Sequence, residues 1–174
     1  MNIKELCEKY NNGERFGYIF FWGEKFQNGY LSNWYPCKFT VDGVDYWCTE
    51  QYMMAKKAEL FGDSGVQGMI MACNDQKKIK DMGRWVKNFD ASIWDENKVR
   101  IVFEGNFAKF SQNEDLKKFI LDTEDKILVE ASPYDKIWGI GRSTNDGTII
   151  HNPNNWLGEN LLGFTLMDVR SKLS

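Results

Sequence analysis

The sequence predicts an α+β fold: a mostly helical single domain over residues 1–174 with a small antiparallel sheet. Two observations carry this prediction. The β-prone runs at 39–41 and 44–47 flank Asp42-Gly43, which is the strongest hairpin signal in the chain. From Thr49 onward, segments with helical periodicity dominate the sequence. A hairpin followed by a helical majority is typical of the α+β class.

The remaining elements follow in chain order. Residues 1–12 are predicted to form a short helix or a loose arm, and the apolar run 18–22 is predicted to form a strand. A second short, buried strand is expected at 127–130. Helices are expected at 49–61, 65–73, 75–86, 91–111, 113–121 and 158–172.

Particular side chains support several of these helices. Thr49, Asp90 and Asn113 are each expected to cap the start of a helix. In the last helix Gly163 interrupts an apolar repeat, which indicates that another element packs closely there. The longest helix is expected to bury one apolar stripe, formed by Val99, Val102, Phe103, Phe107 and Phe110.

Composition narrows the class of protein. A chain of 174 residues with 15% aromatic content is long enough for one ordered domain with a proper core. The formal charge of −3 gives no general attraction to nucleic acid, although it leaves room for a local basic cleft. No window approaches the apolar length of a membrane span, and residues 1–10 lack the core of a signal peptide. We expect a cytoplasmic protein with no membrane partner, whose oligomeric state the sequence does not predict.

The cysteines and the histidine do not indicate a metal site. The four cysteines, Cys7, Cys37, Cys48 and Cys73, show no CxxC spacing. The single histidine, His151, lies in a polar segment rich in Asn and Pro. These residues make no convincing zinc set. We therefore expect reduced thiols, a surface position for His151 and no bound metal.

Glu50 and Lys57 form the most informative pair of residues. They are seven residues apart, which on a helix places them within about 20° of each other and about 10 Å apart along the axis. Met54 and Phe61 fall on the same stripe, so a carboxylate and an amine share an apolar face. Such groups cost free energy unless they are paired or used in chemistry. The alternatives are a structural ion pair and a lysine that extends its amine to the surface.

A second candidate segment is the loop 131–141. It combines a proline, two glycines, an aromatic residue and a carboxylate, a composition that suits a loop lining a pocket. Asp135 is its candidate catalytic carboxylate. Trp138 either stacks on a flat heterocycle or packs in the protein, and Gly139 either lets a ligand approach closely or forms a tight turn.

Four further candidates each have two interpretations. Trp94, at the start of a helix, is a core residue or a platform on which a base stacks. Arg84 binds phosphate with its fork of donors or forms a surface salt bridge. Ser32 and Asn33 are ligands of a ribose or residues that form a turn.

Five local patterns stand in a fixed order along the chain. They are LSNWYP at 31–36, TEQYMMAKKA at 49–58, GR…FD…W between 83 and 94, PYDxxWGxG at 133–141 and GENLLG…LMDVR at 158–170. In this order and spacing they resemble the NADAR family, also called YbiA-like. The resemblance runs from about Phe20 to Leu173, which is nearly the whole chain.

The resemblance implies a YbiA-like fold and an N-glycosidase that needs no cofactor. It implies one of two substrate classes. The first is a small ribosylaminopyrimidine phosphate of riboflavin synthesis, cleaved to ribose 5-phosphate and a base. The second is ADP-ribosyl-guanine in DNA, from which the ADP-ribose is removed.

The resemblance also implies roles for particular residues. Glu50 and Lys57 match the family's glutamate and the lysine seven residues later, and the remaining matches are Trp94, Asp135 and Trp138. Many members have histidine after the glutamate where this chain has Gln51. This departure counts against a mechanism that needs an imidazole at that position.

Two chemical routes fit these residues. In one, Glu50 and Asp135 share the tasks of protonating the leaving base and activating water. In the other, the sugar ring opens and Lys57 forms a Schiff base with C1, which requires an amine whose pKa is lowered. We favour the lysine route. Lys56 points about 100° away around the helix, where it is available to a phosphate.

Two other functions compete with catalysis. One is a non-catalytic module that binds ADP-ribose or a nucleotide, and the other is an interaction protein that keeps the fold. Among enzyme substrates, a basic strip beside the pocket would favour DNA; its residues are Lys77, Lys78, Lys80, Arg84 and Lys87.

Overall fold

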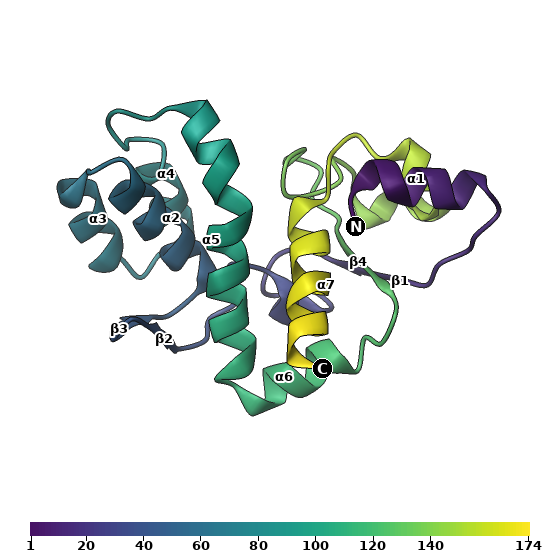
Figure 1. The fold of residues 1–174 in the computed structure, drawn as a ribbon, viewed down its shortest axis with the longest axis horizontal. Coiled ribbons are helices and arrows are strands. Elements are labelled where there is room, and N and C mark those ends of the chain that lie inside the picture. Colours follow the sequence, from purple (N-terminus) through teal and green to yellow (C-terminus); the bar gives the residue numbers. More distant parts are fainter. The chain divides into compact units, whose positions relative to one another are not determined.

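The computed structural model describes residues 1–174 and is rich in helices (Figure 1). The chain forms two compact units. The central unit is Asn33–Lys117, and the terminal unit combines Met1–Ser32 with Lys118–Ser174. The elements are α1 (Ile3–Asn11), β1 (Tyr18–Phe21), β2 (Phe39–Val41), β3 (Val44–Tyr46), α2 (Thr49–Leu60), α3 (Ser64–Met71), α4 (Gln76–Met82), α5 (Ala91–Ser111), α6 (Glu114–Leu121), β4 (Ile127–Glu130) and α7 (Leu161–Leu173). Short 3-10 helices occur at Gly29–Leu31, Thr144–His151 and Pro153–Asn155.

The predicted hairpin is confirmed. Strands β2 and β3 pair antiparallel, with Phe39 opposite Tyr46. Asp42 and Gly43 both have positive φ, 52° and 77°, as the two central residues of a type I′ turn require. Gln112 secures the edge of β2, because its side chain accepts from the Thr40 N–H at 2.9 Å and donates to the Thr40 carbonyl at 2.8 Å.

The second strand pair differs from the expected antiparallel sheet. Strands β1 and β4 pair in parallel, with Tyr18 opposite Ile127 and Phe21 opposite Glu130. More than a hundred residues separate the two strands in sequence. A parallel pair needs such a crossover connection, which a local pattern of residues cannot reveal.

The helices of the central unit follow the predictions with shifted ends. Helix α2 begins at Thr49 as predicted, but the expected cap is wrong: Cys48 is the N-cap, and its Sγ accepts from the Gln51 N–H at 3.4 Å. Asp90 caps α5 as expected, by accepting from Ser92 and Ile93. Helix α4 ends at Met82 rather than at residue 86. The predicted stripe of α5 was wrong at Val99, which is 40% exposed, whereas Val102 and Phe110 are buried.

Helix α7 begins three residues later than predicted because Asn160 is used to attach it to β4. Asn160 has a left-handed φ of 54°, and its side chain accepts from the Glu130 N–H and donates to the Leu128 carbonyl, each at 2.9 Å. The close packing predicted at Gly163 is confirmed, since a Cβ on this residue would collide with the Leu128 carbonyl oxygen. Helix α7 therefore lies directly against the backbone of β4.

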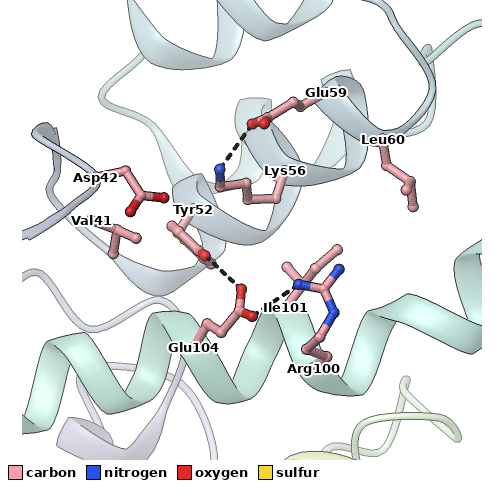
Figure 2. A pocket seen from close by; sticks show the side chains of 9 residues that line it. All are labelled: Val41, Asp42, Tyr52, Lys56, Glu59, Leu60, Arg100, Ile101 and Glu104. Carbon is pink, nitrogen blue, oxygen red and sulfur yellow. Dashed lines mark hydrogen bonds and ion pairs between the residues drawn. The ribbon is translucent and has the colours of Figure 1, made fainter.

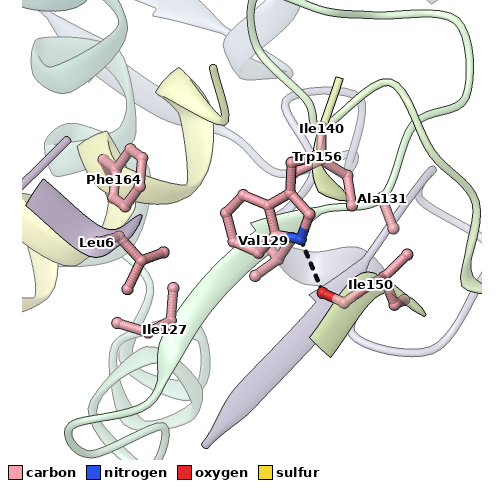
Figure 3. Packing of buried hydrophobic residues seen from close by; sticks show 8 residues of the cluster. All are labelled: Leu6, Ile127, Val129, Ala131, Ile140, Ile150, Trp156 and Phe164. Carbon is pink, nitrogen blue, oxygen red and sulfur yellow. Dashed lines mark hydrogen bonds between the residues drawn. The ribbon is translucent and has the colours of Figure 1, made fainter. Parts of the chain in front are cut away.

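The core of the terminal unit surrounds β4 (Figure 3). The indole N–H of Trp156 donates to the Ile150 carbonyl at 2.7 Å, which fixes the largest ring of the cluster. Leu6 brings the N-terminal segment into this core, so residues 3–11 are a packed helix rather than a loose arm. The cluster consists of Leu6, Ile127, Val129, Ala131, Ile140, Ile150, Trp156 and Phe164. None of the helices combines the length and the apolar character that crossing a lipid bilayer requires.

Candidate active site

Helix α2 carries the two main candidate residues of the central unit. Glu50, in its first turn, is almost fully buried, with 3% of its surface exposed. Its backbone N–H donates to the Asn33 carbonyl at 2.9 Å. Asn33 and the start of α2 are thereby joined next to the buried carboxylate, which brings the predicted residues Glu50 and Asn33 together.

Asn33 is held in turn by a residue of α5 that was not predicted. The side-chain amide of Asn106 donates to Asn33 Oδ1 and to the Val102 carbonyl, each at 3.0 Å. Asn106 is fully buried, and its own Oδ1 has no hydrogen-bond partner. An unsatisfied buried oxygen costs free energy, so Asn106 is a candidate ligand for a hydroxyl or amine group of a substrate.

Lys109, one turn further along α5, is the second candidate that was not predicted. Its side chain is fully buried, and burial lowers the pKa of its amine to about 8, against the opposing influence of Cys37 and Cys48. Both Asn106 and Lys109 fall on the apolar stripe that contains Val102. The criterion that selected Glu50 and Lys57, a polar group on an apolar stripe, would also have found these two residues.

Lys57 lies in a different environment from Glu50. Its Nζ donates to the Gly83 carbonyl at 2.7 Å and lies 4.3 Å from the centre of the Phe89 ring. The Trp94 ring lies at 5.6 Å on the α5 side. Burial, and next the positive charge of Arg84, lower the pKa of this amine below its ordinary value. Both changes favour the neutral amine that a nucleophile needs.

Arg84 and Gln51 have structural partners. The guanidinium of Arg84 is exposed and pairs with Asp81 at 3.1 Å, which fits the salt-bridge interpretation. The buried amide of Gln51 accepts from the Trp47 N–H at 3.1 Å and donates to the Ile70 carbonyl at 3.2 Å. Gln51 therefore joins the hairpin to α3.

A cavity of about 580 Å³ lies on another side of α2 (Figure 2). Neither Glu50 nor Lys57 lines it. Lys56 does, but its Nζ is paired with Glu59 at 3.0 Å, and Arg100 is paired with Glu104 at 2.9 Å. Because Asp42 adds a third carboxylate and both cations are already paired, this lining is unsuited to phosphate. The position of Lys56 thus gives no support to a phosphate-binding role.

The terminal unit contains the other predicted residues. Asp135 Oδ1 accepts from the backbone N–H groups of Ile137 and Trp138 at 2.9 and 2.8 Å, which organises the loop 131–141. Gly139 packs against backbone, since a Cβ there would lie 2.8 Å from the Glu130 carbonyl oxygen. Ser32 is buried and ends the 3-10 helix Gly29–Leu31. These observations favour the tight-turn interpretation for Gly139 and the turn-forming one for Ser32.

Comparison with known proteins decides the family. The sequence model of the NADAR domain matches residues 20–174. The chain belongs to the NADAR family. The match begins inside β1 and includes every candidate residue of both units, so it extends over both the central unit and most of the terminal unit.

Several NADAR relatives are similar over most of this chain. An N-glycosidase of Acanthamoeba polyphaga mimivirus is 49% identical over 163 residues, which are 89% of this chain and 95% of the relative. The protein irg-1 of Caenorhabditis elegans is 34% identical over 82% of this chain and 74% of its own length. A riboflavin biosynthesis protein of Vibrio vulnificus is 31% identical over 89% of this chain but only 38% of its own length.

The fold of the NADAR chain also resembles a solved structure. The NMR structure of the E. coli protein YbiA superposes with a TM-score of 0.74 and 26% sequence identity, covering 92% of this chain and 86% of the other. The YbiA-like, helix-rich α+β fold predicted from the sequence is therefore confirmed.

Proposed function

We propose that this protein is an N-glycosidase that hydrolyses the bond between C1 of a ribose and an exocyclic amine. The observation that carries the proposal is the state of Lys57. Its amine is half-buried, lies against the Phe89 ring, has a lowered pKa and follows a buried glutamate by seven residues on the same helix. Relatives of the family named N-glycosidase support the same reaction class.

Lys57 is the proposed nucleophile. When the sugar ring opens, C1 is bonded as an imine to the nitrogen of the base, and the neutral Nζ of Lys57 adds to C1. The nitrogen of the base receives one proton from the added Lys57 amine and a second from Glu50. The bond from that nitrogen to C1 then breaks, the base leaves as a free amine, and C1 and Lys57 remain joined as a protonated Schiff base. Water then hydrolyses the remaining Schiff base, which releases the sugar and restores the lysine.

The competing route, direct attack by water assisted by Glu50 and Asp135, has weaker support. Asp135 already accepts two backbone hydrogen bonds in its own loop. These two hydrogen bonds give the carboxylate a structural task in its loop. We therefore assign Asp135 the task of holding the loop 131–141 in its conformation.

Most of the other candidate residues are proposed to bind the substrate. Trp94 supplies a ring face beside the reacting amine, and Asn33 is held close to Glu50, where it can bind a ribose hydroxyl. Arg84 is exposed near Lys57 and offers a cation to a substrate phosphate. Ser32 and Gly139 are assigned to their turns rather than to binding. Trp138 is the residue of the loop 131–141 proposed to stack on a flat heterocycle.

Two substrate classes are supported by different observations. The relative named riboflavin biosynthesis protein supports a ribosylaminopyrimidine phosphate. The surface around Arg84 supports ADP-ribosyl-guanine in DNA, because Lys77, Lys78 and Lys87 are exposed there, as are the rings of Trp85 and Phe89. Exposed cations and aromatic rings together are typical of surfaces that bind single strands.

The test is to trap the Schiff base with borohydride. The protein is incubated separately with each substrate, with and without borohydride, and intact and peptide masses are measured. Turnover and a sugar adduct on Lys57 are expected in the native protein, and both should be lost in Lys57→Ala. The matched control is Lys56→Ala, the adjacent lysine on a different face of α2, which should keep both. The substrate that produces the adduct identifies the class.

The possible outcomes separate the claims. Turnover without an adduct would overturn the role of Lys57 and move the chemistry to Glu50 and Asp135. An adduct that persists in Lys57→Ala would also overturn it. If neither substrate is cleaved by a folded protein, the proposed activity is wrong, and the alternative of a non-catalytic module that binds ADP-ribose or a nucleotide takes its place.

A further inference from the structure

The terminal unit contains a cavity of about 660 Å³ that the proposed reaction does not use. Its walls are β1 with Trp22, the segment 26–28 and the segment 143–145. The volume lies in the range of roughly 300–1,000 Å³ that is usual for small-molecule sites. The lining therefore indicates what kind of ligand the cavity suits.

The lining is uncharged. Its eleven residues include no Asp, Glu, Lys or Arg, and their polar side-chain groups are the amides of Gln27, Asn28 and Asn145, the indole N–H of Trp22 and three hydroxyls. A phosphate or a charged peptide would lose its hydration here without gaining a partner of opposite charge. Charge complementarity thus favours a neutral ligand that has donors and acceptors.

One wall of the cavity is an unpaired strand edge. Strand β1 pairs only with β4, and the carbonyls of Gly17 and Phe21 accept hydrogen bonds from the β4 side. Because successive residues of a strand direct their backbone groups to opposite edges, Tyr18 and Phe20 present theirs to the other edge. The Asn28 side chain occupies the Phe20 carbonyl at 3.0 Å. The rest of the edge is a row of backbone donors and acceptors.

Aromatic rings form the second important wall. Trp22 and Phe26 stack with ring centres 5.2 Å apart and an interplanar angle of 10°. Phe26 is 61% exposed, so much of its surface is available to a further flat ring. Ring faces attract heterocycles through stacking, and every nucleobase can take part.

We propose that this cavity binds a nucleobase, which stacks on the Trp22–Phe26 pair and forms hydrogen bonds with the free edge of β1 and the neighbouring amides. A neutral, flat ring with donors and acceptors along its rim matches all three properties of the lining. The inference rests on the proposed function only in that both proposed substrates carry a base.

The test uses NMR spectra of the ¹⁵N-labelled protein titrated with adenosine, ADP-ribose, ribose 5-phosphate and a short single-stranded deoxyadenosine oligomer. Adenosine should shift the backbone amides of Phe20 and Trp22 and the side-chain amide of Asn145. Phe26→Ala should weaken the binding of adenosine about tenfold, the usual size of one lost stacking contact. Its spectrum also reports whether the variant is folded.

Phe119→Ala is the matched control. Phe119 is also an exposed phenylalanine of the terminal unit, 47% exposed, with one aromatic neighbour, Tyr30, at 5.2 Å. It does not line the cavity, so its loss should leave the binding of adenosine unchanged. Equal weakening by the two variants would overturn the proposal.

The four probes separate the possible sources of the base. Shifts at the same amides with ADP-ribose identify a free nucleotide group, and shifts with the oligomer identify a nucleic acid strand. Either result supports the proposal. If adenosine shifts none of these amides, or ribose 5-phosphate shifts them equally, the cavity does not bind a base. Turnover and Schiff-base trapping are measured in separate experiments. A cavity that binds no base can therefore be distinguished from a protein that has no glycosidase activity.

Discussion

Two effects lower the pKa of the Lys57 amine. Desolvation disfavours the ammonium form, and the positive charge of Arg84 disfavours it further. The Gly83 carbonyl meanwhile accepts one N–H, which fixes the direction of the side chain at 2.7 Å. The residue therefore combines a defined orientation with a larger neutral fraction than an exposed lysine has.

The contribution of Arg84 to this amine can be measured through the pH dependence of the reaction. The neutral amine is the reactive form, so the rate should rise as pH rises through the pKa of Lys57. Removing the positive charge in Arg84→Ala raises that pKa, and the ascending limb of the pH–rate profile should move to higher pH. Arg100→Ala, which loses a similar surface salt bridge, should leave the limb in place. If both variants shift the pH–rate profile, or if neither does, the charge of Arg84 does not set the pKa of Lys57.

At the level of single residues, the sequence predicted only part of the candidate site. Glu50 and Lys57 were recognisable because charged groups on an apolar stripe are costly and therefore informative. Asn106 and Lys109 satisfy the same criterion, but the apolar members of the α5 stripe outnumber them and dominate its pattern. The hydrogen bonds of Asp135 and Gln51 could not be predicted, since they depend on loop geometry and on the contact of α2 with α3.

Among the elements, α7 shows how one glycine sets a contact. It lies on β4 without a side chain between the helix and the strand at Gly163, and Asn160 adds two hydrogen bonds to the strand. The apolar repeat of this helix was predictable from its spacing. Its late start was not, because Asn160 gives up a helical conformation to bind backbone groups that are distant in sequence.

Substituting Gly163 should reveal how closely α7 and β4 pack. Gly163→Ala places a methyl group against the Leu128 carbonyl and should lower the free energy of unfolding by about 1–3 kcal/mol. Gly68→Ala, in α3, has open space around the added methyl group and should stabilise the protein by up to about 1 kcal/mol. Urea denaturation measures both. Equal effects of the two substitutions would show that α7 can shift to accommodate the methyl group.

For the whole molecule, the segment before the family match is part of the structure. Helix α1 begins with a capping box, in which Asn2 and Glu5 each bond the backbone of the other, and its Leu6 is fully buried. The sequence prediction left a short helix and a loose arm open, although Ile3, Leu6 and Tyr10 recur at helical spacing. Only the contact with Ile127, Val129 and Phe164 distinguishes the two.

Leu6→Ala tests whether α1 stabilises the terminal unit. The change removes a buried side chain from the core cluster and should cost about 2–5 kcal/mol in the free energy of unfolding. Leu157→Ala makes the same chemical change at an exposed leucine of the same unit, and we expect a cost within about 0.5 kcal/mol. Urea midpoints provide the comparison. A similarly small cost at Leu6 would mean that α1 is dispensable for stability.

The discontinuous terminal unit has a consequence for synthesis on the ribosome. The central unit is one continuous stretch, so all of its internal contacts can form once residue 117 has emerged. Strand β1 appears early but must wait for β4, which is translated more than a hundred residues later. At roughly 5–20 residues per second, the nascent chain carries an unpaired, aromatic-rich strand for several seconds. This interval is when binding by a chaperone would most benefit the protein.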